Sequence, residues 1–185
     1  MEHKGTIRLE TERLILRRVS LGDVKPAFKN WVNDERVTRF LTWQPHGDES
    51  VTEEVFKSWV GSYEKKDFYL WAIVPKDLGE PIGTISGQHI VEEENRLEIG
   101  YCIGYDFWGK GYMPEALKKV IEFLFTEVKP TRIIARHAKE NPNSGRVMQK
   151  AGMKYVTTLP KAGECNYGKV DLLIYDISRD EYYSR

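Results

Sequence analysis

The sequence predicts an α/β fold with a mixed sheet. Three strand-like runs separated by short turns occupy residues 68–104, a strongly amphipathic helical stretch follows them, and strands then alternate with helices. The expected order is strand, two helices, three strands, helix, strand, helix and two strands. At this length we expect one domain over residues 1–185.

The first part of the chain is predicted to form a strand and two helices. Residues 14–19 have strand character, and the apolar residues after them recur at helical spacing. Ser50 and Glu53 are spaced as a capping box, in which each side chain bonds the other residue's backbone N–H, so a second helix is expected there. The apolar side of these two helices would comprise Ala27, Phe28, Trp31, Val32, Val55, Phe56, Trp59 and Tyr63.

The middle of the chain is predicted to be an antiparallel meander, because only short turns separate residues 68–74, 82–91 and 96–104. A helix over 114–127, a strand over 132–136, a helix over 144–151 and strands over 155–158 and 170–177 follow. The strand–helix–strand unit implies two parallel neighbours joined by a crossover.

Composition and charge narrow the functional class. Hydrophobic residues make up 41% and charged residues 30%, which permits a sizeable core. The net charge is zero, so we expect neither nucleic acid nor a membrane as a partner. Cys102 and Cys165 are far apart, which favours free thiols and no metal. Without an apolar N-terminal run or a stretch of ~20 apolar residues, the expected location is cytoplasmic.

The stretch FWGKGYMPEAL, residues 107–117, places two glycines and a lysine before a helix. Gly109 and Gly111 allow a sharp turn and a close approach to a ligand, and the helix N-terminus attracts anions. The spacing matches neither a P-loop nor a dinucleotide fingerprint. A tight turn and a phosphate site both remain open. Gly100 and Gly104, in the preceding strand, also indicate a bend or a close ligand.

Together, residues 97–104, 107–117 and 140–153 resemble the GNAT superfamily of acetyl-CoA-dependent N-acetyltransferases. Residues 11–17 and 170–175 are similar to its RimJ/RimL-like branch, the ribosomal-protein N-terminal acetyltransferases. The resemblance covers nearly the whole chain. It implies a GNAT-like fold with a central mixed, mostly antiparallel twisted sheet, splayed parallel strands and about four flanking helices.

The resemblance also implies where coenzyme A binds. The backbone of Tyr101, Cys102 and Ile103 would hydrogen-bond the pantetheine arm, and Asn141 and Ser144 would form the opposite wall. The loop around the pyrophosphate would comprise Trp108, Gly109, Lys110, Gly111, Tyr112 and Met113. Met113 stands where the family has a small residue.

The implied reaction is direct attack of an amine on the thioester, which needs a base, an oxyanion donor and an acid. Glu98 is the candidate base, directly or through water; alternatively it is a solvated or ion-paired strand residue. Ser144 is the candidate acid toward the thiolate, or a plain helix N-cap. A backbone N–H in residues 101–103 would polarise the carbonyl. His89 and His137 are further candidate bases, although a lone histidine on a strand is more often structural.

The branch implies a protein N-terminal amine as acceptor, and a homodimer. A small amine (a polyamine, an aminoglycoside or an amino acid) is the alternative acceptor. A non-catalytic acyl-CoA-binding module is a second class of function, and it would need neither Glu98 nor Ser144. Among the aromatic residues, Trp43 is a candidate for the acceptor pocket because it lies in a polar connection, whereas Trp31 and Trp59 are expected in the core.

Overall fold

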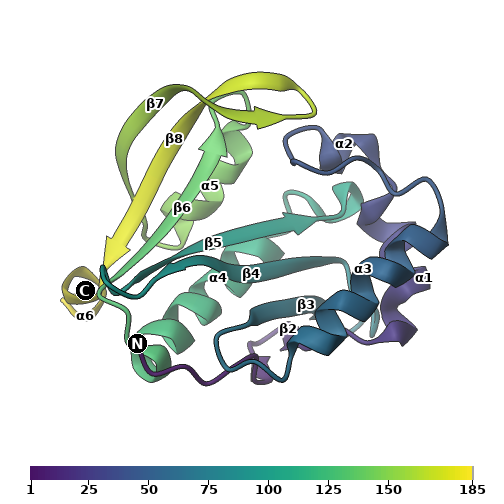
Figure 1. The fold of residues 1–185 in the computed structure, drawn as a ribbon, viewed down its shortest axis with the longest axis horizontal. Helices are drawn as coiled ribbons and strands as arrows, with labels where there is room; N and C mark the ends of the chain where they lie inside the picture. Colours follow the sequence, from purple (N-terminus) through teal and green to yellow (C-terminus); the bar gives the residue numbers. More distant parts are fainter. Residues whose placement is uncertain (185) are drawn as a thin grey trace.

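The computed structural model describes residues 1–184, in which one eight-stranded sheet carries helices on both faces (Figure 1). The strands are β1 (Leu9–Glu10), β2 (Leu14–Arg17), β3 (Tyr69–Pro75), β4 (Gly83–Val91), β5 (Arg96–Ile103), β6 (Arg132–Ala138), β7 (Lys154–Cys165) and β8 (Gly168–Ser178). The α-helices are α1 (Val24–Ala27), α2 (Glu35–Thr38), α3 (Glu49–Ser62), α4 (Tyr112–Phe123), α5 (Pro142–Lys150) and α6 (Arg179–Tyr183).

The sheet order is β1-β2-β3-β4-β5-β6-β8-β7, and within residues 1–184 β5 and β6 form the one parallel pair. The mixed, mostly antiparallel sheet expected from the family resemblance is confirmed. Residues 1–184 contain six α-helices rather than about four, because α2 and α6 are single-turn helices that the apolar periodicity does not reveal.

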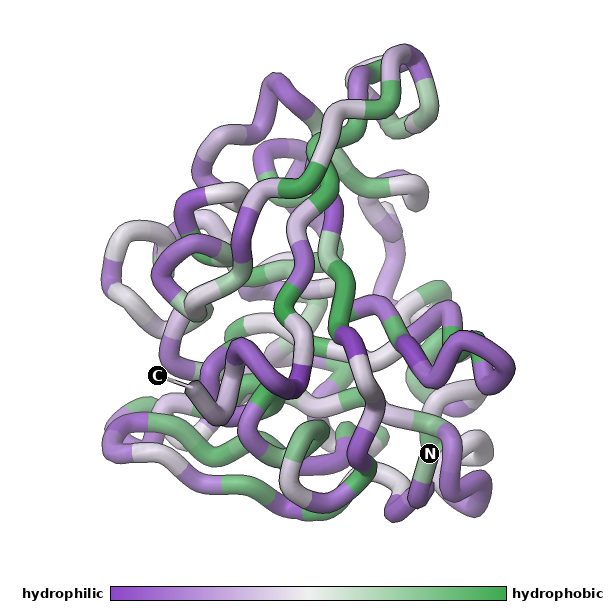
Figure 2. The backbone as a smooth tube through the Cα atoms, turned by 90° about the vertical axis from the view of Figure 1, so that its left-hand side faces the viewer, coloured by the Kyte–Doolittle hydropathy of each residue, from purple (hydrophilic) through white to green (hydrophobic). Residues whose placement is uncertain are grey.

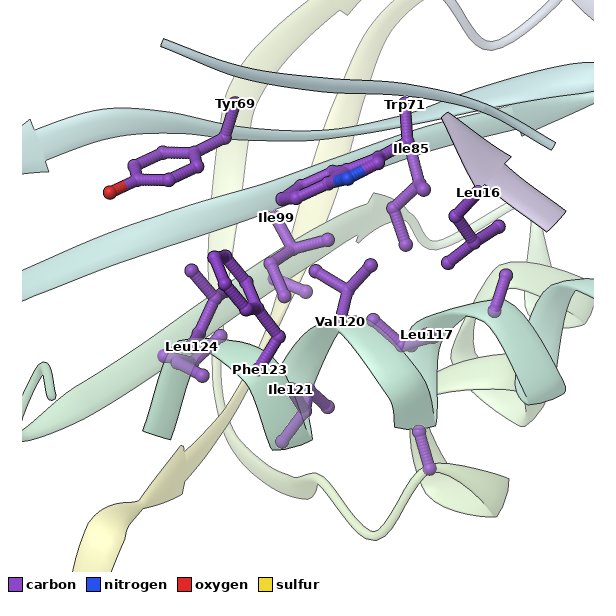
Figure 3. Close-up of a cluster of buried hydrophobic side chains, with 14 of the residues drawn as sticks. Leu16, Tyr69, Trp71, Ile85, Ile99, Leu117, Val120, Ile121, Phe123 and Leu124 are labelled. Carbon is purple, nitrogen blue, oxygen red and sulfur yellow. The ribbon is translucent and has the colours of Figure 1, made fainter. Parts of the chain in front are cut away.

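Strand β3 separates two hydrophobic cores. Tyr69, Trp71 and Ile73 pack toward α4, while the alternate residues of the strand pack toward α1 and α3. Figure 3 shows Trp71 over Phe123 of α4, and their ring centroids are 5.8 Å apart. Because both faces are covered, every residue of β3 is buried, which explains its continuous apolar run.

The predicted capping box at Ser50 and Glu53 is wrong. Helix α3 begins at Glu49, and the Asp48 side chain accepts a hydrogen bond from the Ser50 backbone N–H at 2.8 Å. Asp48 is therefore the N-cap, a role for which aspartate and serine are about equally suited.

The first predicted helix is broken into short pieces. A 3₁₀ turn (Leu21–Asp23), α1 and a π-helical segment (Phe28–Val32) follow one another. Pro26 has no N–H to donate within this stretch. The predicted apolar spacing still holds for Trp31, which is 1% exposed in the core between α3 and the sheet.

A long hairpin of β7 and β8 reaches across the molecule to the turn after α2 (Figure 1). At its tip, the Asn166 backbone N–H donates to the Leu41 carbonyl at 3.1 Å. The Asn166 side-chain amide donates to the carbonyls of Thr38 and Trp43 at 3.0 and 2.8 Å. We call this set of contacts the Asn166 clasp. It joins the tip of the β7–β8 hairpin to the segment that follows α2.

No helix of residues 1–184 is long and apolar enough to cross a membrane. Figure 2 shows that the apolar parts of the chain are short and are interrupted by hydrophilic ones.

An ion pair at the end of β2 gives a stability prediction. Arg17 donates from Nη1 and Nη2 to the buried Asp23 carboxylate at 2.7 and 2.8 Å, and the Ser20 N–H donates to it as well. Burial alone would raise the pKa of Asp23, but these hydrogen bonds outweigh it and lower the pKa.

Asp23→Asn is expected to lower the free energy of unfolding by about 2 kcal/mol at pH 7, measured by urea denaturation. The stabilisation is present above the ordinary pKa of 3.8 and is lost as the pH falls through the lowered folded-state value. The difference between Asp23→Asn and wild type should therefore shrink in acid. Equal urea midpoints for Asp23→Asn and the exposed control Asp77→Asn would contradict the stabilising role of the Arg17–Asp23 ion pair.

Candidate functional site

The parallel strands β5 and β6 pair only at their beginnings and then separate. The register pairs are Arg96 with Arg132, Leu97 with Ile133 and Glu98 with Ile134, and none follows (Figure 1). A cavity of about 330 Å³ lies beyond this point. It is lined by Val37, Phe40, Leu41, Tyr101, Cys102, Ile103, Phe107, Trp108, Gly109, Gly111, Tyr112, Met113, Pro114, Asn141, Asn143, Ser144, Arg146, Val147 and Lys150.

One wall of the cavity is the open edge of β5. The Gly104 N–H donates to the Ile82 carbonyl at 2.8 Å, so even-numbered residues direct their backbone groups toward β4. Tyr101 and Ile103, which alternate with them, direct their backbone groups into the cavity. One of these backbone groups, the Ile103 carbonyl, already accepts a hydrogen bond from Trp108 Nε1 at 2.9 Å. The remaining edge can pair with an extended ligand carrying amide groups.

Gly104 itself is explained by packing and not by a ligand. A Cβ atom there would lie 2.2 Å from the Asn30 carbonyl oxygen, so the close neighbour that the sequence indicated is the backbone of the π-helical segment.

The glycine loop closes one end of the cavity. Gly109 and Gly111 have φ of 76° and 81°, and Gly111 is the N-cap of α4. The first N–H groups of α4 have no earlier helical carbonyl to bond, which suits an anion. Lys110 is exposed and is not part of the cavity wall. Met113 is 4% exposed, because its side chain packs into the core around α4.

The opposite wall is the start of α5. The helix begins at Pro142 with Asn141 as its N-cap, so Ser144 lies inside the first turn and the N-cap alternative for Ser144 is wrong. The Tyr101 hydroxyl donates to the Ser144 carbonyl at 3.0 Å and lies 3.1 Å from Ser144 Oγ. Burial raises the pKa of Tyr101 well above its ordinary value, so its hydroxyl stays protonated. Ser144 Oγ is thus held at the cavity wall.

Glu98 lies outside the cavity wall, on the face of β5 that also carries Cys102. The Arg136 Nε donates to its Oε1 at 2.8 Å, and His89 Nδ1 lies 3.2 Å from its Oε2. The residue is 8% exposed. His89 has a φ of 46° at an irregularity of β4. The carboxylate is therefore ion-paired and is four residues from the cavity residue Cys102.

Two other residues that the sequence singled out lie away from the cavity. His137 is 6% exposed, its ring lies 5.5 Å from that of Tyr175, and its Nδ1 donates to the Ala138 carbonyl at 2.7 Å. Burial lowers its pKa, so the ring is neutral at pH 7. Trp43 is not part of the wall of this cavity: its ring packs beside that of His46, whereas Phe40 and Leu41 line the cavity. The place of Trp43 in the acceptor pocket stays a prediction.

Sequence reasoning missed two cations of the cavity wall, Arg146 and Lys150 on α5. They lie four residues apart on one helix face, and this spacing was the signal available. Phe107 and Val147 were missed as well. Within residues 1–184 no cluster of histidine, cysteine, aspartate or glutamate is arranged to hold a metal ion.

Comparisons with known proteins agree with this arrangement. The model of the acetyltransferase (GNAT) domain matches residues 13–154. The chain is 30% identical over 169 residues to the uncharacterized N-acetyltransferase YoaA of Bacillus subtilis (strain 168), covering 91% of this chain and 95% of that protein. It is 26% identical over 155 residues to the [ribosomal protein uS5]-alanine N-acetyltransferase of Escherichia coli (strain K12), covering 80% and 78%.

A solved structure of similar fold is that of RimL, a ribosomal L7/L12 alpha-N-protein acetyltransferase, in complex with coenzyme A. The TM-score is 0.83 at 17% identity, and the match covers 95% of this chain and 99% of that one.

Proposed function

The chain belongs to the acetyltransferase (GNAT) family, whose members transfer an acetyl group from acetyl-CoA to an amine, and we propose that its acceptor is the N-terminal amine of a protein. The observation that carries the acetyl-CoA site is the open edge of β5 in the cavity that the glycine loop closes at one end. The E. coli relative, which acetylates an alanine of ribosomal protein uS5, supports the choice of acceptor.

The residues of the cavity suit two parts of coenzyme A, the pantetheine arm and the pyrophosphate. The open backbone groups of Tyr101 and Ile103 pair with the amides of the pantetheine arm, and the loop from Gly109 to Met113 holds the pyrophosphate with its N–H groups. Arg146 and Lys150 add positive charge on the α5 side of the cavity.

One part of the cavity wall is apolar. Val37, Phe40 and Leu41 line it, and the Asn166 clasp binds the Leu41 carbonyl from outside. A chain end with a single amine suits this lining better than a multiply charged amine, because apolar side chains offer few partners for several charges.

In the proposed mechanism each proton has a named destination. Glu98, through a water, takes the proton of the acceptor ammonium, and the freed amine attacks the thioester carbonyl carbon. A backbone N–H of Tyr101 or Ile103 stabilises the negative charge on the carbonyl oxygen. As the carbon–sulfur bond breaks, Ser144 Oγ donates a proton to the leaving thiolate, and the second proton of the attacking nitrogen returns to Ser144 Oγ through water as the amide forms. The Tyr101 hydroxyl holds Ser144 in place.

The first test is calorimetric titration of acetyl-CoA into the protein, followed by an acceptor screen that measures release of free thiol. We expect micromolar binding, and turnover with peptides carrying free N-termini in preference to polyamines, aminoglycosides or amino acids. Absence of binding up to millimolar acetyl-CoA would refute the site. Turnover with small amines alone would refute the proposed acceptor.

Ser144→Ala is expected to lower kcat about tenfold while leaving the affinity for acetyl-CoA within about twofold, because the hydroxyl donates its proton to the thiolate that forms as the carbon–sulfur bond breaks, and this charge is absent from bound acetyl-CoA. Steady-state kinetics with the best acceptor of the screen measures this effect. Ser50→Ala, on the exposed side of α3, is the matched control. An unchanged kcat in Ser144→Ala would remove the residue from the chemistry.

A further inference from the structure

The N-terminal segment of residues 11–17 has no part in the mechanism above, yet one of its side chains contacts the glycine loop. Arg13 Nη1 donates to the Lys110 carbonyl at 2.9 Å, and its guanidinium lies 4.7 Å from the centre of the Tyr112 ring. Neither Arg13 nor Lys110 belongs to the cavity wall, whereas Gly111 does. Arg13 therefore binds the loop on the side away from the cavity.

This contact fixes the direction of one peptide unit. In a trans peptide the C=O and the following N–H point in opposite directions. With the Lys110 carbonyl directed outward to Arg13, the N–H of Gly111 is directed toward the cavity. The reversed peptide would place a carbonyl oxygen against the phosphates and repel them. Gly111, without a Cβ, permits both orientations, so a separate contact must select one.

Arg13 is itself held in place by Glu115 in the first turn of α4. Glu115 accepts from Arg13 Nε at 2.7 Å, from the Arg13 backbone N–H at 3.0 Å and from Thr11 Oγ1 at 2.5 Å. Burial would raise the pKa of Glu115, but these hydrogen bonds outweigh it and lower the pKa. The carboxylate stays charged at pH 7 and fixes the guanidinium fork.

The ion pair contributes little to stability as such, because the Arg13 side chain is 44% exposed and water screens it. Its geometry is nevertheless specific, since three guanidinium nitrogens each have an acceptor. This combination indicates a role in shaping the loop.

We propose that Arg13 is a positioning residue for acetyl-CoA, which holds the Lys110–Gly111 peptide in the orientation that presents an N–H group to the pyrophosphate. The inference rests on the proposed function of the loop. It assigns to this chain's N-terminal segment a part in cofactor affinity and none in the acetyl transfer step.

The test is the dissociation constant of acetyl-CoA, measured by calorimetry for wild type, Arg13→Ala, Arg13→Lys and the control Arg8→Ala. Arg8 carries the same charge in an exposed ion pair with Glu10. We expect about tenfold weaker binding for Arg13→Ala, the effect of one lost charge-assisted hydrogen bond, and no change for Arg8→Ala. Arg13→Lys keeps the charge without the fork, so most of the loss should remain.

A second ligand separates positioning from general loosening of the site. S-acetyl-pantetheine lacks the pyrophosphate, so wild type and Arg13→Ala should bind it equally in a displacement titration. Equal losses for both ligands, an unchanged affinity for acetyl-CoA, or full rescue by Arg13→Lys would each overturn the proposal. If wild type itself fails to bind acetyl-CoA, the proposed function and this inference fall together. If wild type binds acetyl-CoA and the Arg13 variants bind it equally well, this inference fails while the proposed function stands.

Discussion

Glu98→Gln is expected to lower kcat by about a hundredfold or more and to leave the affinity for acetyl-CoA within about twofold. General-base catalysis contributes about 10²- to 10⁴-fold to rates, and the amide cannot accept the ammonium proton. The cofactor affinity should hold because Glu98 lies outside the wall that binds coenzyme A. The measurements are steady-state kinetics with the best acceptor and calorimetry with acetyl-CoA.

Two control variants make this result interpretable. Glu98→Gln also breaks the ion pair with Arg136, and Arg136→Gln breaks that pair while keeping the carboxylate. Glu94→Gln removes an exposed carboxylate that pairs with Arg96 near the same strand. Both controls should retain kcat within about fivefold. A Glu98→Gln enzyme with normal turnover would exclude the base role, and the ion-paired structural alternative would then account for the residue.

Gly111→Val is expected to weaken acetyl-CoA binding about a hundredfold. A β-branched residue is strongly disfavoured at a φ of 81°, so the loop must move, and a Cβ would already lie 3.3 Å from Arg13 Nη2. Both effects act on the peptide that faces the pyrophosphate. Calorimetric titration of acetyl-CoA measures the loss.

Gly79→Val is the matched control for this variant. Gly79 has a φ of 73° in the turn after β3, with open space around its Cβ position. Both variants should lower the thermal midpoint to a similar degree, since both strain a left-handed residue by about 1–3 kcal/mol. Only Gly111→Val should lose cofactor affinity. Comparable affinities in the two variants would show that the loop does not contact the pyrophosphate.

The parts of the fold that local patterns specify were predictable. Alternating apolar residues with short turns define the meander of β3, β4 and β5, and the apolar stripe of α4 defines the crossover helix. The resemblance to a known family supplied the separation of β5 from β6. Tyr101, Ile103 and the loop glycines lie together in the cavity wall, and their contacts with coenzyme A stay a prediction from that resemblance.

The parts that depend on distant contacts were not predictable. The Asn166 clasp joins residues more than a hundred positions apart, and no local pattern announces it. No local pattern predicts the ion pair of Glu98 with Arg136 or the contact of Arg13 with the loop either. The length of β7 was underestimated because Pro160 and Gly163 lie within it, and both residues usually argue against a strand.

The short parallel ladder between β5 and β6 has a consequence for how the protein acquires its stability. Only three register pairs join the meander to the strands that follow α4. The two residues of each pair are separated by a long stretch of chain. Contacts of this kind form late in folding, after the local hairpins. A cofactor that contacts both walls of the cavity therefore stabilises the β5–β6 contacts, which form last. At a hundred times its dissociation constant it adds about 2.7 kcal/mol to the folded state.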